Sequence, residues 1–124
     1  MTTFTHTVGT FTLNNSVSLY IPTIYANHGL IEEGKVNETR AQATAYIANF
    51  FGGATVIEGT GYFIHISGIV QEEKAFIINA FADDDSLSHY GERLKALAGW
   101  VATQLEQECV LLVVNGQAGF YEGK

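Results

Sequence analysis

Histidines are the residues of this chain whose type best suits catalysis, because no serine lies in a nucleophile elbow and no carboxylate pair has a spacing that fixes acid and base roles. His65 lies in an expected strand, where a neighbouring Glu58 or Glu73 would tune the pKa of its imidazole for general-base catalysis. The alternative is a partly buried histidine with one backbone partner. His28 lies in an expected loop, a common place for binding residues. His65 and His28 are therefore the candidate catalytic residues.

A cofactor or metal site is not predicted from the spacing of the ligand-type residues. The four histidines lack the i, i+2 and i, i+4 spacings that place two ligands together, and the single cysteine excludes a multi-cysteine site. Gly59-Thr60-Gly61 lacks the third glycine of a dinucleotide fingerprint, and an expected strand follows it. Gly52-Gly53 follows an expected helix instead of preceding one. Cys109 enters an apolar run and is predicted to be a core hydrophobe.

Aromatic side chains form the candidate ligand-binding surface, since several of them fall where they could line a pocket between a sheet and its helices. The same spacing is also typical of an ordinary hydrophobic core. The residues predicted to contact a ligand are Tyr20, Tyr25, Tyr62, Phe63 and His65.

Composition places these residues in one packed domain. The chain has 124 residues, of which 47% are apolar and only 15% are charged. Its 13 acidic residues against six Lys and Arg give a net charge of −7, so a nucleic-acid backbone would be repelled. No apolar run is long enough to span a bilayer and no leader pattern opens the chain, so we expect a cytoplasmic protein without a membrane partner.

The spacing of apolar residues changes between two and 3.6 along the chain, which predicts an α+β domain over residues 1–124. We divide it into an added β arm at 1–15, a core at 16–115 and a short hairpin or tail at 116–124. The Asn37 side chain is expected to cap the first helix, and Asp83-Asp84-Asp85 to start the second. The expected order is strand 16–25, helix 37–51, strand 54–66 bent at 59–61, strand 73–81, helix 86–107 and strand 109–114, followed by a turn at Asn115-Gly116.

This order is the β-α-β-β-α-β plan of a two-layer ferredoxin-like sandwich, with two helices on one face of an antiparallel sheet. Aromatic and aliphatic residues remain for the other face, and an open apolar face of that size usually marks a partner or a ligand. The simplest occupant is a second copy of the chain. We therefore expect a homodimer.

The sequence also resembles a group of small uncharacterised bacterial and phage-encoded proteins over roughly residues 17 to 115. The resemblance rests on Tyr20-Ile21-Pro22-Thr23, Phe51-Gly52-Gly53-Ala54-Thr55, Gly59-Thr60-Gly61-Tyr62-Phe63, Glu72-Glu73 and Gln107-Glu108-Cys109-Val110. It implies a ferredoxin-like plan and carries no activity with it. The Thr-rich N-terminal arm lies outside it.

Three functional hypotheses follow from these features. The first is a non-enzymatic oligomeric module that binds a protein partner or a small ligand through an apolar sheet face or pocket. The second is a cofactor-free dimeric enzyme of the ferredoxin-like type that uses a pocket histidine. The third is an acidic inhibitor of a host or phage protein, which is compatible with the resemblance. The position of the candidate histidines separates the first two, because a catalytic histidine must reach a concave pocket.

Overall fold

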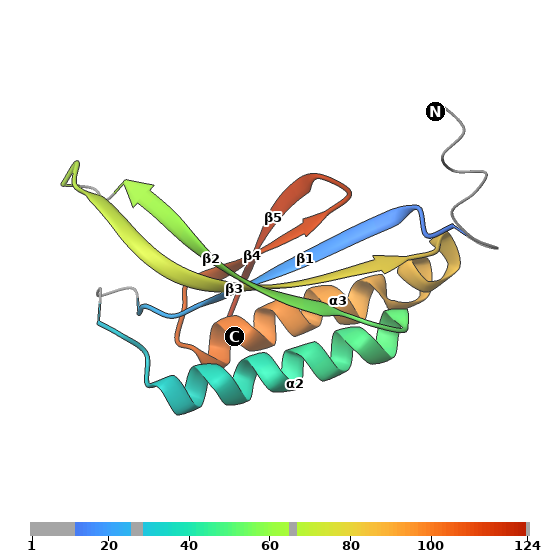
Figure 1. The fold of residues 1–124 in the computed structure, drawn as a ribbon, viewed down its shortest axis with the longest axis horizontal. Helices are drawn as coiled ribbons and strands as arrows, with labels where there is room; N and C mark the ends of the chain where they lie inside the picture. The colour runs from blue at the N-terminus through green and yellow to red at the C-terminus, as the bar shows by residue number, and fades with distance from the viewer. Residues whose placement is uncertain (1–11, 26–28, 65–66, 124) are drawn as a thin grey trace.

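A computed structural model describes residues 12–25, 29–64 and 67–123 of the chain. Its elements are β1 (Asn15–Pro22), α2 (Glu33–Phe51), β2 (Thr55–Ile64), β3 (Val70–Ala82), α3 (Asp84–Gln104), β4 (Cys109–Val114) and β5 (Gln117–Glu122). Figure 1 shows the predicted β-α-β-β-α-β order, with β5 added as a final hairpin strand. The predicted arm at 1–15 falls mostly outside the described residues, and residues 12–14 are not part of a strand.

The strands form one antiparallel sheet in the order β2-β3-β1-β4-β5. Central strand β1 alternates between buried and half-buried residues, because successive side chains of a strand point to opposite faces. Leu19 of β1 pairs with Ile78 of β3 and with Leu112 of β4, so three core side chains lie side by side. Pro22 lies beyond the part of β1 that pairs with β4, where its missing N–H leaves no gap in the ladder.

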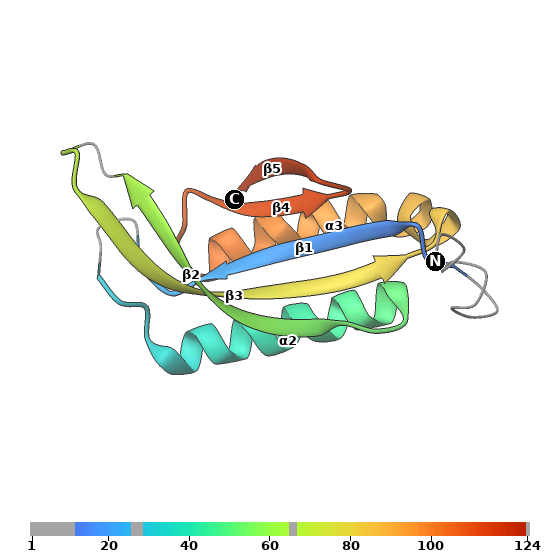
Figure 2. The ribbon, with the colours of Figure 1, turned by 45° about the horizontal axis from the view of Figure 1, so that its top comes forward.

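Both helices cover the same face of this sheet, which confirms the predicted α+β sandwich (Figure 2). α2 lies against β3 and β1, and α3 lies against β1, β4 and β5. The largest fully buried side chains of the layer between them are Leu19, Ile21, Ile47, Ile78, Leu94, Leu105 and Leu112. Among the described residues, no helix combines the length and apolar character needed to cross a membrane.

Helix α2 begins one turn before the predicted start at residue 37. Asn37 is therefore inside the helix and is not its cap; Glu32 holds that position without a side-chain cap hydrogen bond. The extra turn forms because Ile31 and Val36 are 5% and 3% exposed and fix the chain on the core. Gly52 ends the helix at φ 88°, which confirms the predicted left-handed termination.

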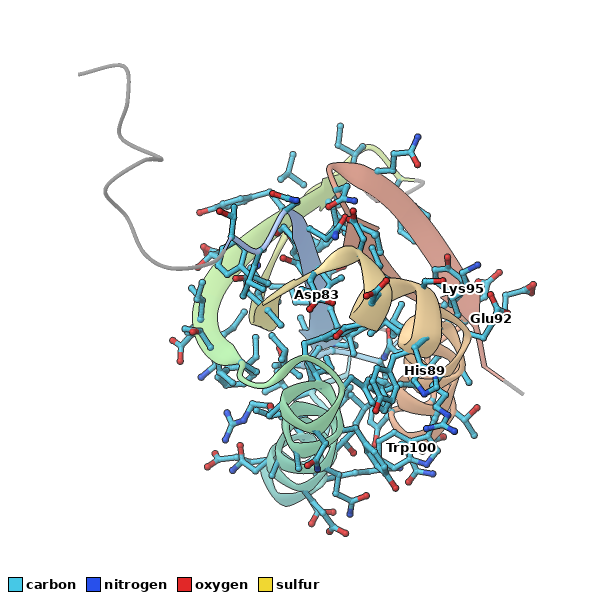
Figure 3. The ribbon with its side chains drawn as sticks, turned by 90° about the vertical axis from the view of Figure 1, so that its right-hand side faces the viewer. Asp83, His89, Glu92, Lys95 and Trp100 are labelled. Carbon is cyan, nitrogen blue, oxygen red and sulfur yellow. The ribbon has the colours of Figure 1, made fainter. Side chains whose placement is uncertain are left out.

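Helix α3 begins at the predicted aspartate cluster. The Asp83 carboxylate accepts a hydrogen bond from the Ser86 backbone N–H at 2.7 Å. This backbone hydrogen bond lowers the pKa of Asp83 from its ordinary value of 3.8, and a hydrogen bond with the Ser86 side chain lowers it further. Figure 3 shows Asp83 at the helix start and Trp100 on the side of the helices away from the sheet. The helix ends at Gln104, three residues before the predicted end at 107.

Strand β2 runs without the predicted break at Gly59–Gly61. Gly61 leaves space on the sheet surface for the Phe63 ring, because a Cβ at this position would lie 3.0 Å from the ring. The predicted turn at Asn115-Gly116 is confirmed, with both residues at positive φ, 51° and 81°.

Candidate functional site

The face of the sheet turned away from the helices is apolar, and no described element covers it. Strand alternation and register place Ile57, Phe63, Phe81 and Phe120 on this face, where they are 49%, 57%, 56% and 68% exposed. The β2–β3 and β4–β5 hairpins rise away from the helices at either side of it (Figure 1). We call this concave surface the open face.

A pocket of about 260 Å³ lies on the open face, and all five strands contribute to it. We call it the open-face pocket. Its walls combine aromatic rings, aliphatic side chains, one carboxylate and one amide, contributed by Tyr20, Phe63, Glu73, Gln107, Leu111 and Phe120 among others. A mixture of this kind, mostly apolar with a few polar groups, is typical of small-molecule sites.

Glu73 supplies the carboxylate of the open-face pocket. Its Oε2 accepts hydrogen bonds from the backbone N–H groups of Thr23, at 3.2 Å, and Ile24, at 3.1 Å. The side chain is half-buried, and two charge-assisted bonds hold it in one orientation. Its neighbours Glu72 and Lys74 point to the other face, since side chains alternate along β3. The pocket therefore contains a fixed negative charge.

Gln107 binds the backbone carbonyl group of Ile24, the residue whose N–H group Glu73 binds. Its Nε2 donates to the carbonyl oxygens of Ile24, at 2.8 Å, and Leu105, at 3.1 Å. Two carbonyl partners fix which end of the amide is the nitrogen. Glu73 and Gln107 together hold the backbone at Ile24, so the polar groups of the pocket are positioned before a ligand arrives.

The combination of a fixed carboxylate with aromatic rings suits an organic cation that carries an apolar or flat body. Aromatic faces attract onium groups, and the rings of Tyr20, Phe63 and Phe120 line the pocket together with the Glu73 carboxylate. Within residues 12–25, 29–64 and 67–123, no group of three or more His, Cys, Asp or Glu side chains is placed to hold a metal ion.

The structure divides the set of residues predicted to contact a ligand. Tyr20 and Phe63 meet in the open-face pocket. Tyr62 points to the opposite face of β2, where its hydroxyl donates to Glu72 Oε1 at 3.4 Å, and Tyr25 packs against the core. His65 and His28, the candidate catalytic residues, lie outside the described residues.

Three residues of the pocket were missed from the sequence in this role. The sequence suggests Glu73 only as a partner for His65. Gln107 lies between α3 and β4, and Phe120 shows only the period of two expected of a strand, so neither gives a signal for this role. Cys109, predicted to be a core hydrophobe, is half-buried and lines the pocket. It points to the open face because Val110 and Leu112, its alternating neighbours, occupy the core side of β4.

Comparison with models of known protein families finds no match, and no functionally curated protein matches the sequence. The fold is similar to that of a phage SAM lyase in complex with S-methyl-5'-thioadenosine, with a TM-score of 0.64 and 10% identity over 94% of this chain and 95% of that one. The phage SAM lyase in its apo state is similar with a TM-score of 0.60 and 15% identity, over 89% and 90% of the two chains. At these identities the likeness establishes a shared fold.

Proposed function

We propose that the open-face pocket binds S-adenosylmethionine and that the protein cleaves it to S-methyl-5'-thioadenosine. The observation that carries the proposal is the Glu73 carboxylate held among aromatic rings. The substrate has the matching groups, namely a sulfonium and an ammonium cation and a flat adenine ring that stacks on aromatic side chains. The similarity to a phage SAM lyase, over nearly the whole length of both chains, supports the same assignment. It also favours the enzyme hypothesis over the non-enzymatic module.

Charge distinguishes the substrate from its product in this site. S-adenosylmethionine is a cation, whereas S-methyl-5'-thioadenosine is neutral. The chain carries a net charge of −7 and places one carboxylate in the pocket, so it attracts the substrate more strongly than the product. Loss of the sulfonium charge on cleavage therefore weakens the contact with Glu73 and promotes release of the product.

The reaction requires no nucleophile from the protein. In the cleavage that we propose, the carboxylate of the substrate attacks its own Cγ carbon while the bond between Cγ and sulfur breaks. The electron pair of that bond stays on sulfur, which gives the neutral thioether, and the remaining fragment closes to an amino lactone without a proton transfer. The pocket contributes by folding the substrate into the attacking conformation and excluding water, and orientation of this kind is the main source of rate in intramolecular reactions. Glu73 holds the positive end of the substrate.

The protein acts as a homodimer in this proposal, with the open face of one copy packed on that of the other. Large apolar side chains such as Phe81 and Phe120, each more than half exposed, supply the driving force. A stable dimer buries roughly 1,200 Å² or more in total. Because the pocket opens onto this face, the second copy would also shield the substrate from water.

An assay for S-methyl-5'-thioadenosine tests the proposal. Purified protein is incubated with S-adenosylmethionine and the products are separated by chromatography. Glu73→Gln keeps an acceptor for the Thr23 and Ile24 N–H groups while removing the charge, so it should fold normally and lose roughly 100-fold or more of the activity. Glu38→Gln, on the outer surface of α2, is the matched control and should retain activity. A wild-type protein that binds neither compound would refute the proposal.

The non-enzymatic module remains the second candidate, because the exposed apolar residues of the open face favour a binding surface whether or not catalysis occurs. Calorimetric titration with S-methyl-5'-thioadenosine separates the two. Binding of this compound without turnover of S-adenosylmethionine would support a ligand-binding module, and binding with turnover would support the enzyme.

A further inference from the structure

A second pocket, of about 560 Å³, lies on the helix side of the sheet and is larger than the open-face pocket. Its walls come from the first turns of α2, from the helix-facing residues of β3 and from the segments on either side of residues 26–28. We call it the helix-side pocket. Neither the predicted ligand residues nor the proposed cleavage reaction accounts for it.

One wall of the helix-side pocket is apolar and belongs to the rigid part of the molecule. Ile31 and Val36 line it and are 5% and 3% exposed, and Phe76 packs against the same core. Ile31 is also held by its backbone N–H, which donates to the Thr23 carbonyl oxygen at 2.9 Å. The wall is therefore fixed in position, and an aliphatic group could contact the part of it that remains accessible.

The rim of the helix-side pocket carries both signs of charge. Lys74 lines it together with Glu33 and Glu72. The ion pair of Lys74 with Glu58 is long, at 4.0 Å, and both side chains are more than half exposed, so it contributes little and leaves the ammonium able to bind a ligand. Glu72 accepts a hydrogen bond only weakly from Tyr62, at 3.4 Å.

Two cationic side chains lie beside Phe76, and one of them, Lys74, lines the helix-side pocket itself. Arg40 lies 4.3 Å and Lys74 5.5 Å from the centre of the same Phe76 ring. These are two of only six Lys and Arg residues in the sequence. Among the described residues, Arg40 forms no ion pair within 4.0 Å. Two cations beside one ring repel each other, and an anion bound between the ring and the rim would relieve that repulsion.

We infer that the helix-side pocket is a separate site for a free α-amino acid with an apolar side chain. The carboxylate would bind Lys74, the ammonium would bind Glu72 and Glu33, and the side chain would rest on Ile31 and Val36. A carboxylate and an ammonium on one carbon match a rim that presents both charges, whereas an anion alone would face two glutamates that form no ion pair among the described residues. This assignment does not depend on the proposed cleavage of S-adenosylmethionine.

The two pockets lie on opposite faces of β3. They are linked because Thr23 and Ile24, which line the helix-side pocket, donate their backbone N–H groups to Glu73 of the open-face pocket. A substitution that removes these hydrogen bonds would disturb both sites, so Glu73 is unsuitable as a control. Phe120, on β5 at the far side of the sheet, lines the open-face pocket and is not among the described residues that line the helix-side pocket. Phe120→Ala is therefore the control for the helix-side pocket.

The test is a titration of isotope-labelled full-length protein with L-leucine, followed by backbone amide NMR. We expect saturable shifts at Leu30, Ile31 and Val36. 4-Methylpentanoate, which is L-leucine without the ammonium, and isopentylamine, which is L-leucine without the carboxylate, should each bind roughly tenfold or more weakly, because each leaves a charged partner unpaired. Lys74→Met and Glu72→Gln are both at exposed positions and should each weaken L-leucine binding by a similar factor, while Phe120→Ala should not change it.

Three outcomes would overturn the inference. One is the absence of saturable shifts in the folded wild-type protein. Another is equal affinity for L-leucine and 4-methylpentanoate, which would indicate a site for simple carboxylates. The third is unchanged L-leucine binding in both charge variants when their spectra show the native fold. Activity toward S-adenosylmethionine is measured separately, so failure of this inference would leave the proposed cleavage standing, and the reverse also holds.

Discussion

The two faces of the sheet are built from the same strands and have opposite roles. On the helix side, Val17, Leu19 and Ile21 of β1 are at most 1% exposed. On the open face, Phe81 and Phe120 are 56% and 68% exposed although they are equally apolar. Burial of the helix-side residues offsets the conformational entropy that the chain loses on folding. The open-face residues remain available for a ligand or a second copy.

A shift of one residue in register would exchange these roles, because successive side chains alternate between the faces. Glu72 and Glu73 illustrate the separation most sharply. Glu73 belongs to the open-face pocket and is held by backbone N–H groups, while Glu72 lines the helix-side pocket. Substitutions at adjacent positions of one strand should therefore have different consequences.

The largest expected effect on stability comes from a pair of neighbours on β4. Leu112 is 1% exposed on the helix side, and Leu111 is half-buried on the open face. Leu112→Ala should lower the free energy of unfolding by about 2–5 kcal/mol through lost burial and a cavity. Leu111→Ala should lower it by much less. Urea denaturation at low protein concentration measures both, and equal losses would contradict the distinction between the faces.

A charge on the open face should act on assembly instead of folding. Phe120→Asp places a carboxylate in the proposed dimer interface, where burial of an unpaired charge is costly. The wild-type protein is expected to sediment near twice 13.5 kDa at micromolar concentration and the variant near 13.5 kDa. Lys35→Asp, a charge change at the N-terminal end of α2, should leave the mass unchanged. A monomeric wild-type protein would remove the open face as a site of self-association.

A smaller effect is expected where the chain turns from α2 into β2. Cβ atoms added at Gly52 and Gly53 would both meet open space, but only Gly52 has positive φ, at 88°. Gly52→Ala should therefore cost on the order of 1 kcal/mol of stability, and Gly53→Ala less. Thermal unfolding of the two variants provides the comparison. If Gly52→Ala kept its stability but lost ligand binding, the glycine would be a contact site and not a helix end.

The smallest predicted effect is a pH dependence at the start of α3. Folding lowers the pKa of Asp83 below 3.8 because the ionised carboxylate accepts the Ser86 N–H. Its contribution to stability is therefore complete above pH 3.8 and is lost as the pH falls through the lower value of the folded state. Asp83→Asn can still cap the helix but does not titrate there. Thermal unfolding of the two proteins from pH 6 to pH 2 should converge as the pH falls, and a constant difference would contradict this origin.

The spacing at which apolar residues recur within each segment is sufficient to predict most of the fold. The alternation in β1 and the helical spacing of Leu94, Leu97 and Val101 predicted these elements and the single helix-covered face. The early start of α2 could not be read from local signals, because burial of Ile31 and Val36 stabilises that turn. The continuity of β2 was missed for a similar reason: pairing along β3 overrides the tendency of Gly59 and Gly61 to bend the chain.

The candidate site was harder to predict because it depends on register between strands. Alternation shows that Phe63 and Gly61 share a face, but only the pairing of Gly61 with Glu73 brings the carboxylate beside them. Phe120 reaches the same pocket from the opposite edge of the sheet, through the pairing of β4 with β5 and the curvature of the sheet. Turn lengths and propensities in one sequence do not determine these long-range relations.

The most direct test of the account is a crystal structure of the protein with S-methyl-5'-thioadenosine bound. We predict that the nucleoside occupies the open-face pocket, with its ring against Phe63 or Tyr20 and its sulfur on the side of Glu73. The same crystals would show whether a second copy covers the site. A nucleoside bound on the helix side, or an open-face pocket that stays empty when the ligand binds in solution, would contradict the account.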